Sequence, residues 1–120
     1  NICTSEALMA LAATVYLAVM GPQGLRQVAE LCYEKAHYAS SLISKLRGYS
    51  LPISGAFFQE FVVRCPAPPA EVNRRLLERG IIGGLDVSDH VPDGMLLCVT
   101  ETNTRQEIDA LAEALAEVGR

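Results

Sequence analysis

The chain has 120 residues and a formal net charge of −4, from 10 basic and 14 acidic residues. Half of it is hydrophobic and a fifth is charged, which is ordinary globular usage and excludes a disordered chain. The acidic balance also argues against nucleic acid as a partner, because affinity for nucleic acid comes mostly from Lys and Arg on phosphates.

The first predicted element is a helix over residues 5–20, capped by Thr4 or Ser5 and ended by Gly21-Pro22. It is apolar on nearly every face, which predicts a helix buried in a larger body. The apolar run is shorter than the ~20 residues that cross a bilayer, and no basic stretch precedes it as in a signal peptide. We therefore expect no membrane segment. Because the chain begins with Asn1 rather than Met, we expect it to be a piece of a longer protein.

A second, long helix is predicted over residues 24–47. Its apolar positions recur at steps of three and four, which is the helical period: Leu25, Val28, Cys32, Ala36, Ala39, Ile43 and Leu46. Such a helix would be ~36 Å long. We interpret it as a connecting helix, so that residues 1–48 form a helical segment and residues 49–120 a small domain.

The small domain is predicted to contain a strand at 57–64, a helix at 70–79, a short strand at 81–82 and a strand at 95–100. Thr104 to Glu107 has the pattern of a capping box and opens a last helix. This order predicts an α+β fold, a mainly antiparallel sheet with helices on one face. Its expected core residues are Phe57, Phe61, Val63, Leu97, Val99, Ile108 and Leu111.

Few residues carry recognisable chemistry. The only lysines, Lys35 and Lys45, fall on the polar side of the long helix, where solvation explains them better than a Schiff-base role. Gly83-Gly84 lacks the spacing of a phosphate-binding loop and predicts a tight turn or a close backbone approach at a strand end. The loop with Asp86, Asp89, His90 and Asp93 matches no calcium pattern, and we interpret it as solvated turns rather than a metal site. The cluster Arg74, Arg75 and Arg79 is interpreted as a solvated helix face.

Five residues are candidate active-site or interface contacts: Asn1, Thr4, Arg64, Glu101 and Thr102. Each also has a structural explanation. Thr4 suits a helix cap, Arg64 an exposed strand end, and Glu101 a helix N-terminus. No catalytic residue and no metal ligand is assigned. The four scattered cysteines show no zinc or redox spacing, which predicts reduced thiols and a cytoplasmic location.

An ordered set of short strings covers almost the whole chain. It includes Asn1-Ile2-Cys3-Thr4, Lys35-Ala36-His37-Tyr38, Phe57-Phe58, Leu77-Glu78-Arg79-Gly80-Ile81-Ile82-Gly83-Gly84-Leu85 and Cys98-Val99-Thr100-Glu101. In this order the strings resemble the C-terminal region of glycine dehydrogenase (decarboxylating) subunit 1, the N-terminal-half subunit of the glycine cleavage system P-protein.

The resemblance implies the aminotransferase-like fold of fold type I pyridoxal-phosphate enzymes, with this chain as the small C-terminal domain and its connecting helix. It implies an oxidoreductase that decarboxylates glycine and passes the aminomethyl group to the lipoyl H-protein. In the two-subunit form, subunits 1 and 2 build a heterotetramer, and subunit 2 holds the pyridoxal phosphate. This chain alone is then expected to hold no cofactor, to be inactive and to self-associate through its apolar helix. The alternative is a free-standing α+β interaction or small-ligand-binding module without catalysis.

Overall fold

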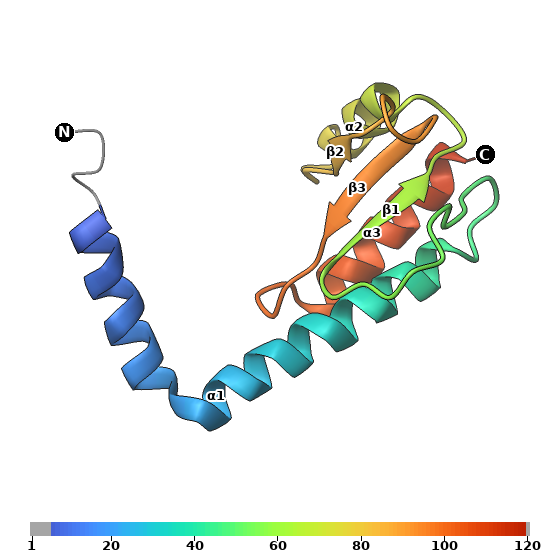
Figure 1. Cartoon of the computed structure of the whole chain (residues 1–120). Helices are drawn as coiled ribbons and strands as arrows, with labels where there is room; N and C mark the ends of the chain where they lie inside the picture. The colour runs from blue at the N-terminus through green and yellow to red at the C-terminus, as the bar shows by residue number, and fades with distance from the viewer. Residues whose placement is uncertain (1–5, 120) are drawn as a thin grey trace. The chain divides into compact units, whose positions relative to one another are not determined.

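The computed structural model describes residues 6–119 and contains two compact units, Asn1–Glu30 and Leu31–Arg120 (Figure 1). The boundary between them falls inside the first helix, whereas the sequence analysis set the division at residue 48. The difference arises because the helical residues Ala36, Ala39 and Ile43 already belong to the core of the second unit.

Helix α1, Glu6–Ile43, is broken at Gly21, as the sequence predicted. Gly21 has φ of 62° and ψ of −179°, and Pro22 follows it. Glycine reaches this conformation without the steric cost that a Cβ would add. The continuing helix ends at Ile43 rather than at 47, because Lys45 and Leu46 already form the tighter bonds of turns, to the carbonyls of Leu42 and Ile43.

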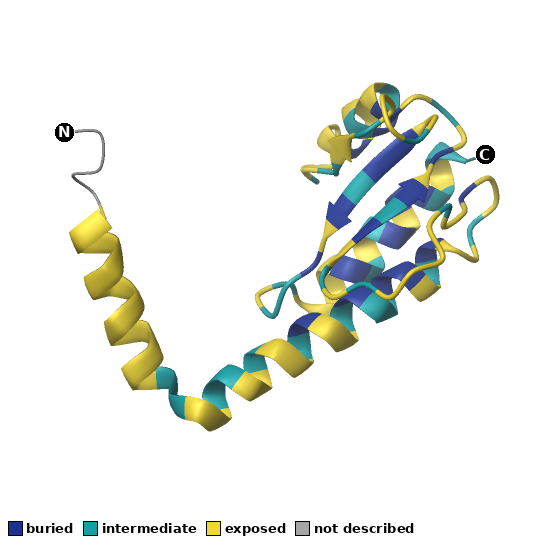
Figure 2. Cartoon of the chain, viewed as in Figure 1, coloured by how far each residue is buried: buried dark blue, intermediate teal, exposed yellow. Residues whose placement is uncertain are grey.

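The segment of α1 before the break is not buried within this chain. Residues 6–19 are all exposed in this chain (Figure 2), including Leu8, Met9, Leu11, Val15 and Val19. The domain 31–120 completes its core without these side chains, and burial of this helix in a larger body stays a prediction. An 18-residue window of α1, mean hydropathy 1.5, is long and apolar enough to cross a membrane by composition. A single such helix is weak evidence, since core helices of water-soluble proteins pass the same test.

The sheet has three antiparallel strands in the order β1-β3-β2: β1 Glu60–Arg64, β2 Leu85–Asp86 and β3 Gly94–Cys98. β1 starts later than predicted because the Phe57 ring turns to stack on His37, with ring centroids 4.2 Å apart. The short strand expected at 81–82 is wrong. The Ile81 amide bonds the Leu76 carbonyl at the end of the preceding helix, so pairing with β3 begins only at Leu85.

Two further helices complete the domain, α2 Pro69–Leu77 and α3 Arg105–Val118. The capping box of Thr104 and Glu107 is present as predicted. Residues 31–43 of α1 lie beside α3 (Figure 1), and the Tyr38 hydroxyl bonds Asp109 between the two helices. Five of the seven predicted core residues are buried: Phe61, Val63, Leu97, Val99 and Ile108. The other two, Phe57 and Leu111, are half-buried and pack against the core. The α+β prediction with an antiparallel sheet is confirmed.

Candidate functional site

The turn after β3 is fastened to helix α1 through Glu101. The Cys32 thiol donates to Glu101 Oε2 at 3.2 Å, and the Glu101 amide donates to Cys32 Sγ at 3.3 Å. The Lys35 ammonium donates to the Glu101 carbonyl oxygen. Burial, followed by the hydrogen bond to the Glu101 carboxylate, raises the pKa of the Cys32 thiol. The amide, carbonyl and carboxylate of Glu101 are therefore all bound by α1; we call Cys32, Lys35 and Glu101 the Glu101 clamp.

The rest of this turn is closed by its own side chains. The Thr100 amide donates to Asn103 Oδ1 at 2.9 Å, and the hydroxyls of Thr100 and Thr102 lie 2.9 Å apart. Thr102 is exposed, whereas Glu101 and Asn103 are half-buried. The predicted contact Thr102 thus lies at the surface of an ordered turn.

The structure does not bring the other predicted contacts to this turn. Arg64 is exposed and pairs with Gly94, at the start of β3, whereas Glu101 follows the end of β3. Arg64 and Glu101 therefore lie at opposite ends of the sheet. Asn1 and Thr4 lie outside the described residues.

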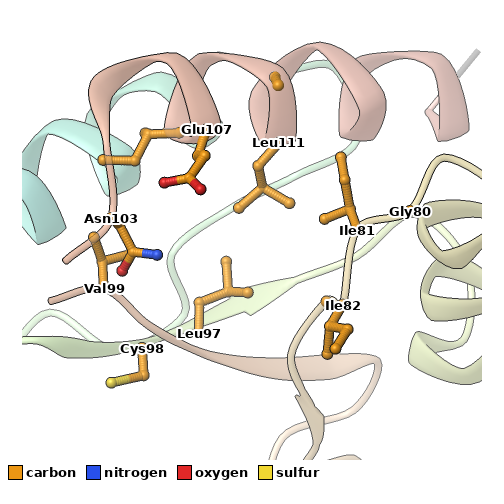
Figure 3. A pocket seen from close by; sticks show the side chains of 12 residues that line it. Gly80, Ile81, Ile82, Leu97, Cys98, Val99, Asn103, Glu107 and Leu111 are labelled. Atoms are coloured by element: carbon orange, nitrogen blue, oxygen red, sulfur yellow. The ribbon is translucent and has the colours of Figure 1, made fainter.

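A cleft of about 300 Å³ opens beside the same turn (Figure 3). Its walls come from the segment 80–83, the end of β3 and the first half of α3. Leu97, Val99 and Leu111 supply apolar surface, and Asn103 and Glu107 supply polar groups. The Glu107 carboxylate accepts a hydrogen bond from the Thr104 amide, and this bond is the largest cause of the lowered pKa of Glu107. The carboxylate is therefore engaged in the helix cap. The cleft is an apolar depression whose polar edge is shared with the Glu101 turn.

Neither lysine is placed as a Schiff base to pyridoxal phosphate requires. Lys35 is half-buried rather than solvated as expected, and its ammonium is held by the Glu101 carbonyl. Lys45 is exposed in the turn after α1. A cofactor lysine needs a free amine in a pocket that also holds the phosphate. Neither lysine meets this requirement, and no chemical step is assigned to the described residues.

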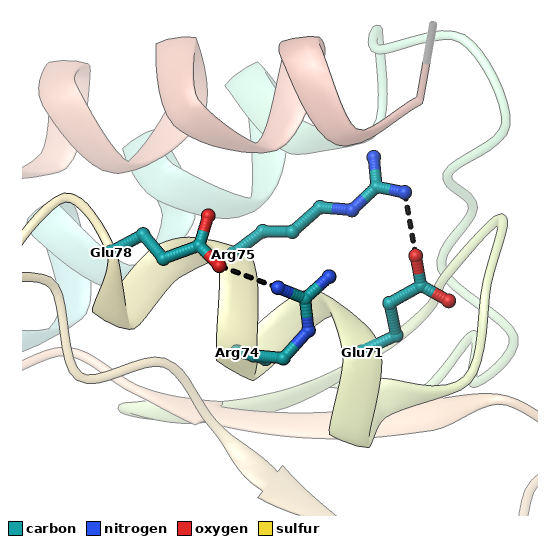
Figure 4. Close-up of polar contacts among 4 residues, drawn as sticks. All are labelled: Glu71, Arg74, Arg75 and Glu78. Atoms are coloured by element: carbon teal, nitrogen blue, oxygen red, sulfur yellow. Dashed lines mark hydrogen bonds and ion pairs between the residues drawn. The ribbon is translucent and has the colours of Figure 1, made fainter.

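The three arginines of the helix predicted over residues 70–79 are all paired with carboxylates. Arg74 bonds Glu78 and Arg75 bonds Glu71, each one helical turn away (Figure 4). Arg79, just after α2, bonds Glu117 on α3. These exposed pairs confirm the interpretation as a solvated helix face, since their charges are already compensated.

Gly83 and Gly84 are required by close packing. A Cβ at Gly84 would lie 2.4 Å from the Leu96 carbonyl oxygen, and one at Gly83 would lie 2.1 Å from Asn73 Oδ1. The Asn73 amide also donates to the Gly84 carbonyl at 2.8 Å and accepts from its amide at 3.2 Å. The prediction of a close backbone approach at a strand end is confirmed.

The acidic side chains of the loop before β3 are exposed, and the Asp93 carbonyl accepts from the Cys65 amide at 2.9 Å. Asp86 Oδ1 accepts from the Ser88 hydroxyl at 2.5 Å and from its amide at 2.9 Å, and these bonds lower the pKa of Asp86. His90 is exposed. Among residues 6–119, no three His, Cys, Asp or Glu side chains are grouped as a metal site requires.

Sequence reasoning missed two features of this region. Cys32 was interpreted only as a small core residue, and its partner lies 69 positions away. Tyr33, His37 and Phe57 form a stack, with ring centroids 4.0 and 4.2 Å apart. The spacing Cys32-x-x-Lys35, which places a thiol and an amine on one helix face, was the available signal.

Known proteins resemble this chain along nearly all of its length. The "Probable glycine dehydrogenase (decarboxylating) subunit 1" of Thermomicrobium roseum is 60% identical over 120 residues, covering 98% of this chain and 27% of the relative. The protein of the same description from Chlorobium limicola is 50% identical, covering 97% of this chain and 26% of the relative. The chain therefore spans about a quarter of the length of these relatives.

Two solved structures share the fold. A glycine decarboxylase (P-protein) of the glycine cleavage system, in inhibitor-bound form, matches with a TM-score of 0.91 and 38% identity, covering 98% of this chain and 27% of that chain. A phosphoserine aminotransferase from Cytophaga hutchinsonii matches with a TM-score of 0.65 at 17% identity, covering 87% of this chain and 29% of that chain, which supports the aminotransferase-like fold alone. The family model of the glycine cleavage system P-protein matches residues 1–115, and the chain belongs to this family.

Proposed function

We propose that this chain is the C-terminal part of subunit 1 of glycine dehydrogenase (decarboxylating). The observation that carries the proposal is the match to glycine decarboxylase, with a TM-score of 0.91 and 38% identity over 98% of this chain. The 60% identity to the Thermomicrobium roseum subunit supports it. The domain then contributes to an enzyme that decarboxylates glycine and passes the aminomethyl group to the lipoyl arm of the H-protein.

In this proposal the pyridoxal phosphate is bound by subunit 2, and the two subunits form a heterotetramer in the cytoplasm. The engaged ammonium of Lys35 and the exposed position of Lys45 support a cofactor lysine outside these 120 residues, either on subunit 2 or in the rest of the same protein. The chain alone is then inactive. In this proposal no nucleic acid and no membrane takes part, and the compensated arginine pairs of α2 support the absence of a nucleic-acid partner.

The residues proposed to contact the remainder of the enzyme are the five that the sequence analysis singled out: Asn1, Thr4, Arg64, Glu101 and Thr102. Two of them, Arg64 and Thr102, are exposed and available to a partner. Glu101 is half-buried, and its amide, its carbonyl and one carboxylate oxygen already bind α1, so we propose that it acts on a partner through the turn it anchors.

The test is to co-express the full-length protein that carries this chain with subunit 2 and to measure glycine-dependent CO₂ exchange in the presence of H-protein. Activity that requires both chains is the expected result. A stable complex without exchange would leave a structural role in some other assembly. Failure to form a complex would favour a free-standing interaction or small-ligand-binding module.

A further inference from the structure

The Glu101 clamp joins two parts of the chain that the proposed function needs to hold together. On one side is helix α1, which enters the compact domain at Leu31, next to Cys32. On the other is the turn that presents Thr102 and forms the Asn103 edge of the cleft. We propose that Cys32 and Lys35 are positioning residues, which hold this turn in place through Glu101 so that Thr102 and Asn103 meet the rest of the enzyme.

The geometry favours a positioning role over simple packing. Cys32 is 4% exposed and uses its sulfur both as donor and as acceptor toward the same residue. Lys35 lies one helical turn after Cys32, and its ammonium donates to the Glu101 carbonyl oxygen. A hydrogen bond from a charged donor is stronger than one from a neutral donor. Two side chains of one helix therefore fix three separate groups of Glu101.

Beyond Glu101, the turn has little to order it except its own contacts. The Thr100 amide, the Thr102 hydroxyl and the Asn103 amide are all bonded within residues 100–103. When the link to α1 is removed, these local bonds alone are left to hold the turn, so it opens more often. The clamp therefore keeps the turn both closed and in place against α1.

The domain offers a matched control for this idea. The Tyr38 hydroxyl donates to Asp109 Oδ1 at 2.6 Å, which is also a bond from α1 to an element after β3. It binds α3 and touches none of the residues of the turn. Tyr38→Phe removes one such bond and leaves the clamp intact.

The experiment uses the full-length subunit bound to subunit 2 and compares Cys32→Ala, Lys35→Met and Tyr38→Phe. We expect amide hydrogen exchange at 100–103 to rise roughly tenfold in the first two variants, the effect of losing about one strong hydrogen bond. Tyr38→Phe is expected to leave that exchange unchanged. The glycine-dependent CO₂ exchange should change in kcat or KM only in the clamp variants, and Cys32→Ser and Lys35→Arg should restore both readouts.

Two results would overturn the inference. One is exchange at 100–103 that is the same in the clamp variants as in Tyr38→Phe, because the turn would then be ordered without α1. The other is faster exchange together with kinetic constants equal to those of Tyr38→Phe. The kinetic readout rests on the proposed function: an inactive wild-type pair would refute that function, while the hydrogen exchange would still decide whether the clamp holds the turn.

Discussion

Replacing Gly84 by alanine should destabilise the domain by about 2–5 kcal/mol. The added Cβ would lie 2.4 Å from the Leu96 carbonyl oxygen, 2.6 Å from Met95 Cγ and 2.9 Å from Leu97 Cδ2. Backbone cannot move aside as a flexible side chain can, so overpacking of about 1–3 kcal/mol is expected. Displacement of Gly84 also breaks one or both bonds to the Asn73 amide, at about 1 kcal/mol each.

The matched control is Gly55→Ala, because a Cβ there meets nothing within 4 Å. This change is expected to be neutral or to stabilise by about 0.4–1 kcal/mol, by restricting the unfolded chain. Both variants are compared with the wild type by urea unfolding, monitored by far-ultraviolet circular dichroism. The midpoints are compared when the free energy of unfolding has the same dependence on urea concentration in each protein. Equal midpoints for Gly84→Ala and Gly55→Ala would refute the close approach of Gly84 to β3.

Four other predictions follow from named features. Thr104→Ala should lower the free energy of unfolding by about 1 kcal/mol through loss of the capping box, with the exposed Gln106→Ala as control in thermal unfolding. Hydrogen bonds from the Thr104 amide and hydroxyl hold the pKa of Glu107 below its ordinary value of 4.5. The stabilisation from this carboxylate is therefore complete above that pH and is lost as the pH falls through the lowered pKa. The unfolding midpoint of Glu107→Gln should therefore fall less with acid than that of the wild type, and parallel pH curves would contradict this. Thiol labelling at neutral pH, with the modified cysteines identified by peptide mapping, should modify the exposed Cys98 before the buried Cys65. Burial raises the pKa of the Cys65 thiol to about 11, so little of it is the reactive thiolate. Equal labelling rates at the two cysteines would count against the fold. Sedimentation should show self-association of the 120-residue chain that Leu11→Glu reduces, since Leu11 is 60% exposed; a monomeric wild type at high concentration would contradict the role of this helix.

Local signals in the sequence predicted much of this fold. Thr104 and Glu107 mark a helix start by bonding each other's backbone, and Gly21-Pro22 breaks α1 at the expected residue. Such features depend on residues only a few positions apart, so the sequence determines them directly. The strand at 81–82 was misplaced because the end of α2 competes for the Ile81 amide.

The candidate site was harder to predict because its contacts join distant positions. Glu101 was ambiguous between a helix-entry residue and a cleft residue, and its actual partners lie on a helix about 66 to 69 positions earlier. Periodicity placed Cys32 on the buried stripe of that helix and Lys35 on its polar side. It could not indicate that both would meet one residue after β3.

The strand order β1-β3-β2 has a consequence for how the domain forms during synthesis. β2 and β3 are separated by a short loop and can pair soon after both have left the ribosome, whereas β1 must wait for β3, which follows it in the chain by way of α2 and β2. Until then the apolar side chains Phe61 and Val63 have no cross-strand partners. The late emergence of β3 makes β1 the part of the nascent domain most exposed to aggregation or to binding by chaperones.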